Sequence, residues 1–249
     1  MTYIEFLLIF TVVPIIILAF LLRKDLNAKY IRTLLLVSAI AFAATALWDN
    51  YAVYSGIWMF PPEKTLGIYL WYVPLEEYMF FFLQTYLTGL VQLFYLLKGG
   101  YDPKSGMAGS RANVQIFPLI VLMSMFTLQQ TQEDVILLPF GKLNYLFHLF
   151  SWSGAFVLIQ FIFGGRKIRD NAKLIFIPTL IMTAYFSLAD SISIGNGIWS
   201  FDPEQTIGTK VGNVPLEEIL FFFMTNLLVT EAMVLFLNQS LLKPKQKIS

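Results

Sequence analysis

The pentapeptide Val-Pro-Leu-Glu-Glu occurs twice in the chain, each time at the start of a strongly apolar stretch. Proline suits the first turn of a helix, which places both carboxyl groups of each copy in that turn. A carboxyl group within or beside lipid is costly unless it is protonated or paired. The motif therefore predicts acid–base chemistry, with one acid protonated as a donor and another ionised as an acceptor. The predicted site residues are Pro74, Glu76 and Glu77 in the first copy and Pro215, Glu217 and Glu218 in the second.

The two acids of a pair must have different surroundings, because adjacent residues on a helix point about 100° apart. We expect Glu77 and Glu218 to be the more deeply placed acids, and which of them donates the proton stays open. An N-terminal cap at the lipid interface would explain a single glutamate. The recurrence of the same pair in both copies favours function, since acids inside a membrane are functional by default.

Other polar and aromatic residues recur around each motif. An aspartate near the end of the preceding apolar stretch is as well suited to a structural polar clamp as to catalysis. A tryptophan in the following loop either anchors at the membrane interface or faces a cation. A phenylalanine one turn after the acids gives them an aromatic neighbour. The predicted supporting residues are Asp49, Trp58 and Phe80 in the first copy and Asp190, Trp199 and Phe221 in the second.

Several kinds of site are absent from the sequence. The chain has no cysteine and a single histidine, which excludes disulfides and iron–sulfur clusters and argues against a transition-metal site. Its net charge of +1 offers no basic field for nucleic acid. His148 has no counterpart in the other copy, and we expect it to be a packing residue. Glu231 is also unmatched, and its role stays open.

The motif belongs to a longer internal repeat. Residues 49–82 and 190–223 align without a gap at an offset of 141 (190 minus 49), and about half of the positions are identical. The shared residues include Gly-Ile-Trp, Val-Pro-Leu-Glu-Glu and Phe-Phe-Phe. Shared hydrophobicity alone would not give this agreement. We therefore expect two three-helix units, each with one acidic pair.

The composition of the chain indicates that membrane-spanning helices carry these motifs. The chain is 57% hydrophobic and 13% charged, whereas soluble domains carry roughly 45–50% apolar and about 25% charged residues. Glu5, with no Lys or Arg before the first apolar run, argues against a cleaved signal peptide. A helix needs about 20 apolar residues to span a bilayer. Seven stretches qualify: 3–22, 33–54, 74–97, 114–131, 143–163, 174–194 and 214–238.

Basic residues orient these spans, because Lys and Arg favour cytoplasmic loops. They gather after the first, third, fifth and seventh spans, which predicts a multi-pass protein of the cell membrane with its N-terminus outside and its C-terminus cytoplasmic. The unpaired fourth span makes the two units run in the same direction, related by an axis along the membrane normal. Both acidic motifs then lie on the outer side, where they could share one cavity.

The predicted fold class is therefore an all-α integral membrane protein with seven transmembrane helices, built from two parallel three-helix repeats plus a linking helix. Its predicted divisions are a first repeat, a linker with the fourth span, a second repeat and a basic cytoplasmic tail. They cover residues 1–100, 101–135, 136–242 and 243–249.

Two Pro-x-Glu-Glu motifs on duplicated three-helix membrane units resemble the integral-membrane lycopene cyclases, over nearly the full length of the chain. In that family the units occur as two separate subunits, as one fused chain, or fused further to a phytoene synthase. The resemblance implies that this chain is the fused, cyclase-only form. It implies that Glu76, Glu77, Glu217 and Glu218 are the essential acids and that the two prolines fix their placement.

The resemblance also implies a reaction and a substrate. A protonated acid adds H⁺ to the terminal double bond of lycopene, the carbocation closes a six-membered ring, and a base removes a proton to leave a β-ionone end. No cofactor is expected, because this isomerisation involves no net redox change. The expected partners are lycopene or a related acyclic carotenoid in the bilayer, membrane lipid and, as a further option, other carotenoid-pathway enzymes.

Alternatives remain open at this point. A C50 carotenoid cyclase or a carotenoid hydratase would use the same carbocation. A proton-coupled transporter would also suit parallel repeats with intramembrane acids, although the acids cluster toward one face. A non-catalytic scaffold of a carotenoid pathway fits the doubled acids less well.

Overall fold

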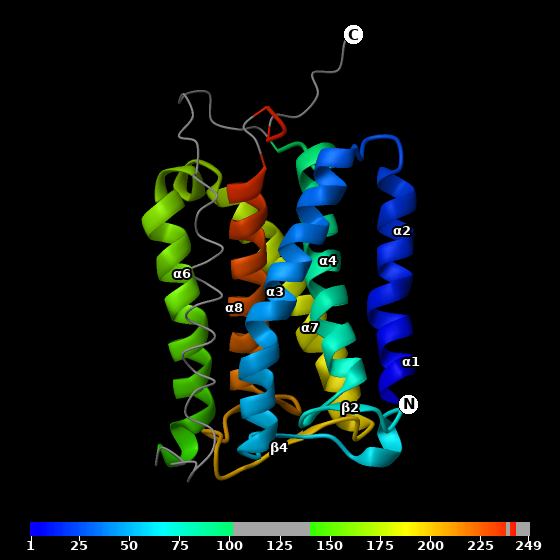
Figure 1. Cartoon of the computed structure of the whole chain (residues 1–249), viewed down its shortest axis with the longest axis vertical. Helices are drawn as coiled ribbons and strands as arrows, with labels where there is room; N and C mark the ends of the chain where they lie inside the picture. Colours follow the sequence, from blue (N-terminus) through cyan, green and yellow to red (C-terminus); the bar gives the residue numbers. More distant parts are fainter. Residues whose placement is uncertain (102–139, 238–239, 243–249) are drawn as a thin grey trace.

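The computed structural model describes residues 1–101, 140–237 and 240–242, and this part of the chain is mostly helical (Figure 1). The first helix is continuous but contains a π-helical turn, η1, between α1 and α2. Six helices in the described ranges are long and apolar enough to cross a membrane. The bounds are α1 (Tyr3–Leu7), η1 (Leu8–Val12), α2 (Val13–Leu22), α3 (Ala28–Tyr54), α4 (Leu75–Lys98), α6 (Asn144–Asp170), α7 (Ala172–Gly195) and α8 (Leu216–Phe236).

The strands are short and lie together at one end of the helices, where the N-terminus also lies (Figure 1). Strands β2 and β3 form a hairpin directly before α4, and β5 and β6 form one directly before α8. Strand β1 pairs antiparallel with β4, which joins the two halves of the chain. The bounds are β1 (Trp58–Met59), η2 (Pro62–Lys64), β2 (Tyr69–Leu70), β3 (Val73–Pro74), η3 (Gly141–Leu143), β4 (Ser200–Phe201), β5 (Lys210–Val211) and β6 (Val214–Pro215), η2 and η3 being 3₁₀ turns.

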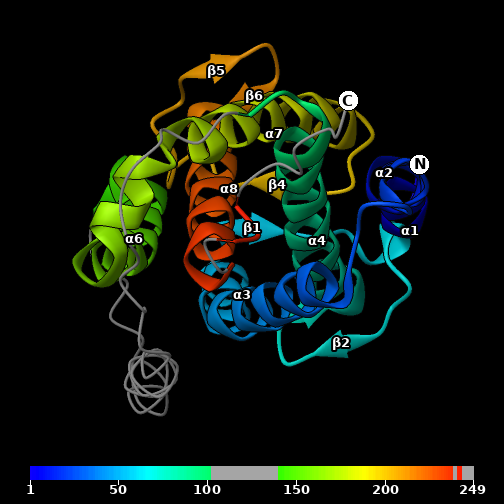
Figure 2. The ribbon, with the colours of Figure 1, turned by 90° about the horizontal axis from the view of Figure 1, so that it is seen from above.

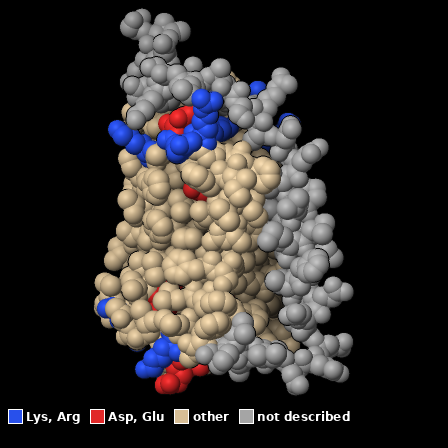
Figure 3. Space-filling model, turned by 90° about the vertical axis from the view of Figure 1, so that its left-hand side faces the viewer, with Lys and Arg blue, Asp and Glu red and all other residues tan. Residues whose placement is uncertain are grey.

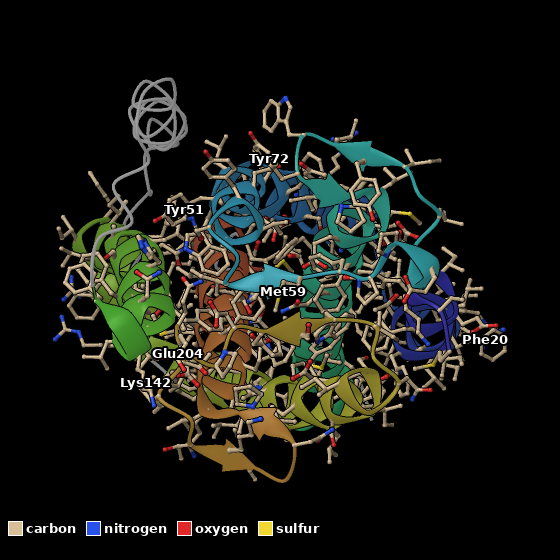
Figure 4. All side chains as sticks on the ribbon, turned by 90° about the horizontal axis from the view of Figure 1, so that it is seen from below. Phe20, Tyr51, Met59, Tyr72, Lys142 and Glu204 are labelled. Atoms are coloured by element: carbon tan, nitrogen blue, oxygen red, sulfur yellow. The ribbon has the colours of Figure 1, made fainter. Side chains whose placement is uncertain are left out.

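Helices α4 and α8 lie in the middle of the bundle, with α3 and α7 beside them and α1–α2 and α6 farther out (Figure 2). Both central helices begin at the strand end. Viewed from that end, Met59 lies near the centre and Phe20 at the periphery (Figure 4). The two acidic motifs therefore start the two innermost helices on the same side.

The distribution of polar groups is that of a membrane protein. Large apolar side chains such as Ile16 and Leu188 are exposed on the outside, while Gln84, Thr88 and Asn226 are buried between helices. One face of the molecule shows charges gathered near its two ends, with a broad and nearly uncharged belt between them (Figure 3). Apolar side chains facing outward and polar ones paired inside are what a lipid environment demands.

Six of the seven predicted spans are confirmed as helices, although two extend well beyond their predicted ends. α3 starts at residue 28 rather than 33, because the Asn27 side chain caps it by accepting the N–H groups of Lys29 and Tyr30 at 2.9 and 3.2 Å. α6 continues to residue 170 rather than 163, since Lys and Arg end an apolar stretch without ending a helix. The predicted fourth span, 114–131, lies outside the described residues.

Candidate active site

Each acidic pair lies in the first turn of a central helix. Helix α4 starts at Leu75 and α8 at Leu216. Pro74 and Pro215 precede them in extended conformation, with φ and ψ of −65° and 149° and of −58° and 145°. The prolines are therefore N-cap residues, one position before the predicted first turn, because each also ends the hairpin strand that leads into the helix. A fixed φ near −65° suits that strand-to-helix junction.

The first glutamate of each pair holds the preceding loop. Glu76 Oε1 accepts the backbone N–H of Leu66 at 2.5 Å, and Glu217 Oε1 accepts that of Ile207 at 2.6 Å. Each donor lies ten residues before its acceptor, so the bond closes the loop onto the start of the helix. The other oxygen of each carboxyl group has no hydrogen-bond partner among the described residues.

The second glutamate of each pair bonds to a tyrosine hydroxyl. Tyr3, from α1, donates to Glu77 Oε2, and Tyr145, from α6, donates to Glu218 Oε1. Both tyrosines are fully buried. Glu77 and Glu218 are 5% and 4% exposed, against 0% for the other two glutamates. The prediction that Glu77 and Glu218 are the more deeply placed acids is therefore wrong. The two acids of each pair differ instead in their hydrogen-bond partners.

Glu77 and Glu218 line one cavity of about 20 Å³, roughly the room that one water molecule needs. Trp58 and Trp199 are 4% and 7% exposed and line it too, so they are not interface anchors but belong to the site. Aromatic faces attract a cation without reacting with it. Among the described residues, the cavity is lined by Tyr3, Trp58, Phe60, Glu77, Phe80, Trp199, Phe201, Glu218, Phe221 and Phe222.

Both halves of the chain contribute to each side of this cavity. The ring of Tyr3 lies 5.1 Å from that of Trp199, and the ring of Tyr145 lies 6.0 Å from that of Trp58. Each tryptophan therefore reaches the tyrosine–glutamate pair of the other half. The pairing of β1 with β4 holds the two loops that carry these tryptophans side by side (Figure 4).

The two aspartates are fully buried and do not line the cavity. Asp190 Oδ1 accepts a hydrogen bond from Trp199 Nε1 at 2.7 Å. Neither oxygen of Asp49 has a partner among the described residues. Within the part of the chain that the structure describes, no hydrogen bond joins either aspartate to one of the four glutamates. The clamp role therefore fits Asp190, which fixes the orientation of a cavity tryptophan.

Sequence analysis missed four residues of the site: Tyr3, Tyr145, Phe60 and Phe201. The phenylalanines recur at the repeat offset, and this signal alone would have identified them. The tyrosines share the pattern Tyr-x-x-x-Leu at an offset of 142 (145 minus 3). The first span is strongly apolar apart from Glu5 and Thr11, and only the folded chain brings its tyrosine to Glu77.

The unmatched residues lie away from the cavity. His148 Nε2 is 3.0 Å from the Tyr51 hydroxyl, and its packing role stays a prediction. Glu231 is buried within α8 and does not line the cavity. Among residues 1–101, 140–237 and 240–242, no group of three or more His, Asp and Glu side chains could hold a metal ion.

These features define a class of protein: a helical membrane protein in which two halves each supply one tyrosine-bound carboxyl group to a buried, aromatic-lined cavity. The chain belongs to the lycopene cyclase family, whose sequence profile matches residues 1–95 and 142–236. The two matched segments have equal length and are displaced by 141 residues (142 minus 1), the offset of the repeat.

Individual relatives agree with this assignment. A lycopene beta-cyclase of Halobacterium salinarum is 30% identical over 80% of this chain and 79% of its own length. Bifunctional lycopene cyclase/phytoene synthases of Podospora anserina and Aspergillus oryzae are 29% and 31% identical over 79% and 84% of this chain, which spans 34% of each of them. No solved structure matches the chain significantly. The chain is thus an enzyme that catalyses a cyclisation, an intramolecular lyase or isomerase reaction, rather than a transporter or a scaffold.

Proposed function

We propose that the chain is a lycopene β-cyclase that closes the ψ ends of lycopene into β-ionone rings. The observation that carries this proposal is the shared cavity: the carboxyl groups of Glu77 and Glu218 line one small space whose other walls are aromatic. Cyclisation needs a proton donor and a proton acceptor on one end group, with water kept away from the cation between the two steps.

The reaction balances without any co-reactant. One carboxylic acid gives its proton to the terminal double bond of the ψ end, which leaves a tertiary carbocation. The next double bond attacks that cation, forming the ring bond and moving the charge into the ring. The other carboxylate then removes a ring proton, and the electron pair of that C–H bond becomes the ring double bond. One proton enters and one leaves, so no cofactor is required.

The four glutamates divide into two roles in this proposal. Glu77 and Glu218 exchange protons with the substrate. Glu76 and Glu217 position the loops, because their bonds to backbone N–H groups hold each loop against the helix that carries the acid. Pro74 supports the same junction.

The aromatic residues around the cavity stabilise the carbocation and must move apart to admit the end group. Trp58 and Trp199 line the cavity, where their aromatic rings lower the energy of the passing charge. A volume of about 20 Å³ does not hold a ring-sized end group, so binding must move side chains apart. Phe60 and Phe201 are the half-buried members of the lining, which makes them the residues that move first.

Topology supports placing the two acids on one end group. Strands β1 and β4 pair antiparallel with Met59 opposite Ser200, and Gln84 bonds to its repeat equivalent Thr225 at 3.0 Å. Equivalent residues meet in this way around a two-fold axis along the membrane normal, the arrangement of parallel repeats. We retain the seven-helix count, the division at residues 1–100, 101–135, 136–242 and 243–249, and the orientation with the N-terminus outside as proposals.

The chemistry of the substrate also determines how it reaches the cavity. Lycopene is a hydrocarbon that dissolves in bilayer lipid, so it approaches the bundle from the side. Association with other carotenoid-pathway enzymes would shorten its path from the preceding step.

The proposal is tested by expressing the chain in a host that accumulates lycopene and separating the pigments by chromatography. We expect lycopene to be replaced by monocyclic and bicyclic products with β rings. Unchanged lycopene, with the protein demonstrated in the membrane fraction, would contradict the proposal. A product with added oxygen would show that water captures the cation, as in a hydratase, and a product of a C50 substrate alone would indicate the related C50 cyclase.

A further inference from the structure

Glu77 and Glu218 have closely matched surroundings. Each accepts a hydrogen bond from the hydroxyl of a tyrosine in the first helix of its own half. Each follows a glutamate that accepts a loop amide, at 2.5 Å in one half and 2.6 Å in the other. Each faces the same cavity beside a phenylalanine at the next turn, Phe80 or Phe221. Nothing in these contacts marks one carboxyl group as the dedicated acid and the other as the dedicated base.

We propose that Glu77 and Glu218 exchange the roles of acid and base in successive ring closures, so that the proton taken from one end group is given to the next. This inference rests on the proposed cyclase function. When Glu77 gives its proton and Glu218 removes one from the ring, the enzyme is left with Glu218 protonated and Glu77 ionised. That state is the starting state with the two residues interchanged.

The geometry makes the interchanged state productive. An end group turned by half a rotation about the axis between the two halves presents its terminal double bond to Glu218 and its ring proton to Glu77. A rotation preserves handedness, so both binding directions give the same ring. The cavity therefore needs no proton from solvent between turnovers.

The lining offers few competing proton carriers. Among the described residues that line the cavity, the titratable groups are the two carboxyls and the Tyr3 hydroxyl, which already donates to Glu77. The two halves differ in the hydrogen bonds of their aspartates. Asp190 accepts a hydrogen bond from Trp199, whereas Asp49 has no hydrogen-bond partner among the described residues. This difference biases which glutamate holds the proton between turnovers and leaves both able to donate.

The test is an isotope crossover with the native protein in lipid vesicles. The vesicles contain an equal mixture of two lycopenes, one deuterated at the position whose hydrogen is removed and one uniformly ¹³C-labelled. We expect deuterium from the first molecule to appear in up to about half of the rings of the ¹³C product, at the carbon that the acid protonates. Deuterium-free ¹³C rings would overturn the inference, because the removed proton would then be lost to water.

A second arm separates alternation from a single residue that gives and retakes its own proton. Glu77→Gln and Glu218→Gln are each assayed for ring formation, with membrane insertion and thermal unfolding as folding controls. Alternation predicts that both variants lose ring formation, and full activity in either one would overturn it even if crossover occurs. Absence of any ring formation by the native chain would instead refute the cyclase proposal itself.

Discussion

Removing the hydroxyl of Tyr3 tests whether the tyrosine–glutamate contact matters for catalysis. In Tyr3→Phe the ring still packs beside Phe60 and Trp199, with centroids 6.0 and 5.1 Å away in the native chain. The lost feature is the hydrogen bond to Glu77. The variant thus isolates one interaction at the acid.

The size of the effect follows from the value of that bond. A hydrogen bond to a charged group contributes about 1.5–3 kcal/mol, and each 1.36 kcal/mol is tenfold in rate. We therefore expect kcat to fall by roughly 10- to 150-fold if the bond stabilises the ionised glutamate during the reaction. Since Tyr145 holds Glu218 in the same way, Tyr145→Phe should lose a similar factor.

The assay is conversion of lycopene by purified protein in lipid vesicles, with kcat and KM determined separately. Tyr185→Phe is the matched control, because its hydroxyl donates to the backbone carbonyl of Phe10 at 2.9 Å and touches no acid. Thermal unfolding of all three variants reports any general loss of stability. If Tyr3→Phe kept the kcat of Tyr185→Phe, the argument that tyrosine positions or stabilises the acid would be refuted.

Two further predictions concern neighbouring contacts. Glu76→Gln keeps an oxygen that can accept the hydrogen bond from the loop amide, so the rate of ring formation should fall by less than about tenfold. A rate as low as that of Glu77→Gln would mean that Glu76 also moves a proton. Thr88→Val removes the 2.7 Å hydrogen bond from Thr88 to Asn226 between α4 and α8. We expect this change to lower the free energy of unfolding in lipid by about 0.6–1.7 kcal/mol and to leave KM unchanged. An unchanged free energy of unfolding would show that this bond does not hold the central helices together.

Hydropathy and the repeat predicted much of the fold. Six spans and the position of both acidic motifs at helix starts follow from apolar length and proline placement. Their common end of the bundle follows from the parallel direction predicted for the two repeats. The ends of α3 and α6 could not be predicted from apolar length, because a capping Asn27 and a basic last turn extend helices beyond the lipid-compatible stretch.

The site could be predicted only in part. The sequence predicted the four glutamates as site residues, but the different hydrogen bonds of Glu76 and Glu77 depend on where the loop folds back, which no local pattern encodes. Tyr3 belongs to a helix far away in sequence from Glu77, and a tyrosine in an apolar span is indistinguishable from a packing residue until the helices are assembled. Trp58 was ambiguous for the same reason, since interface and cavity positions can have the same local sequence.

The central claim is that Glu77 and Glu218 together move the protons of one ring closure. The most direct measurement is the rate of ring formation by purified Glu77→Gln and Glu218→Gln in lycopene-containing vesicles, beside the matched Glu76→Gln and Glu217→Gln proteins. The account predicts no ring formation in the first two and substantial activity in the second two, with all four equally folded. An undiminished rate in either Glu77→Gln or Glu218→Gln would contradict it.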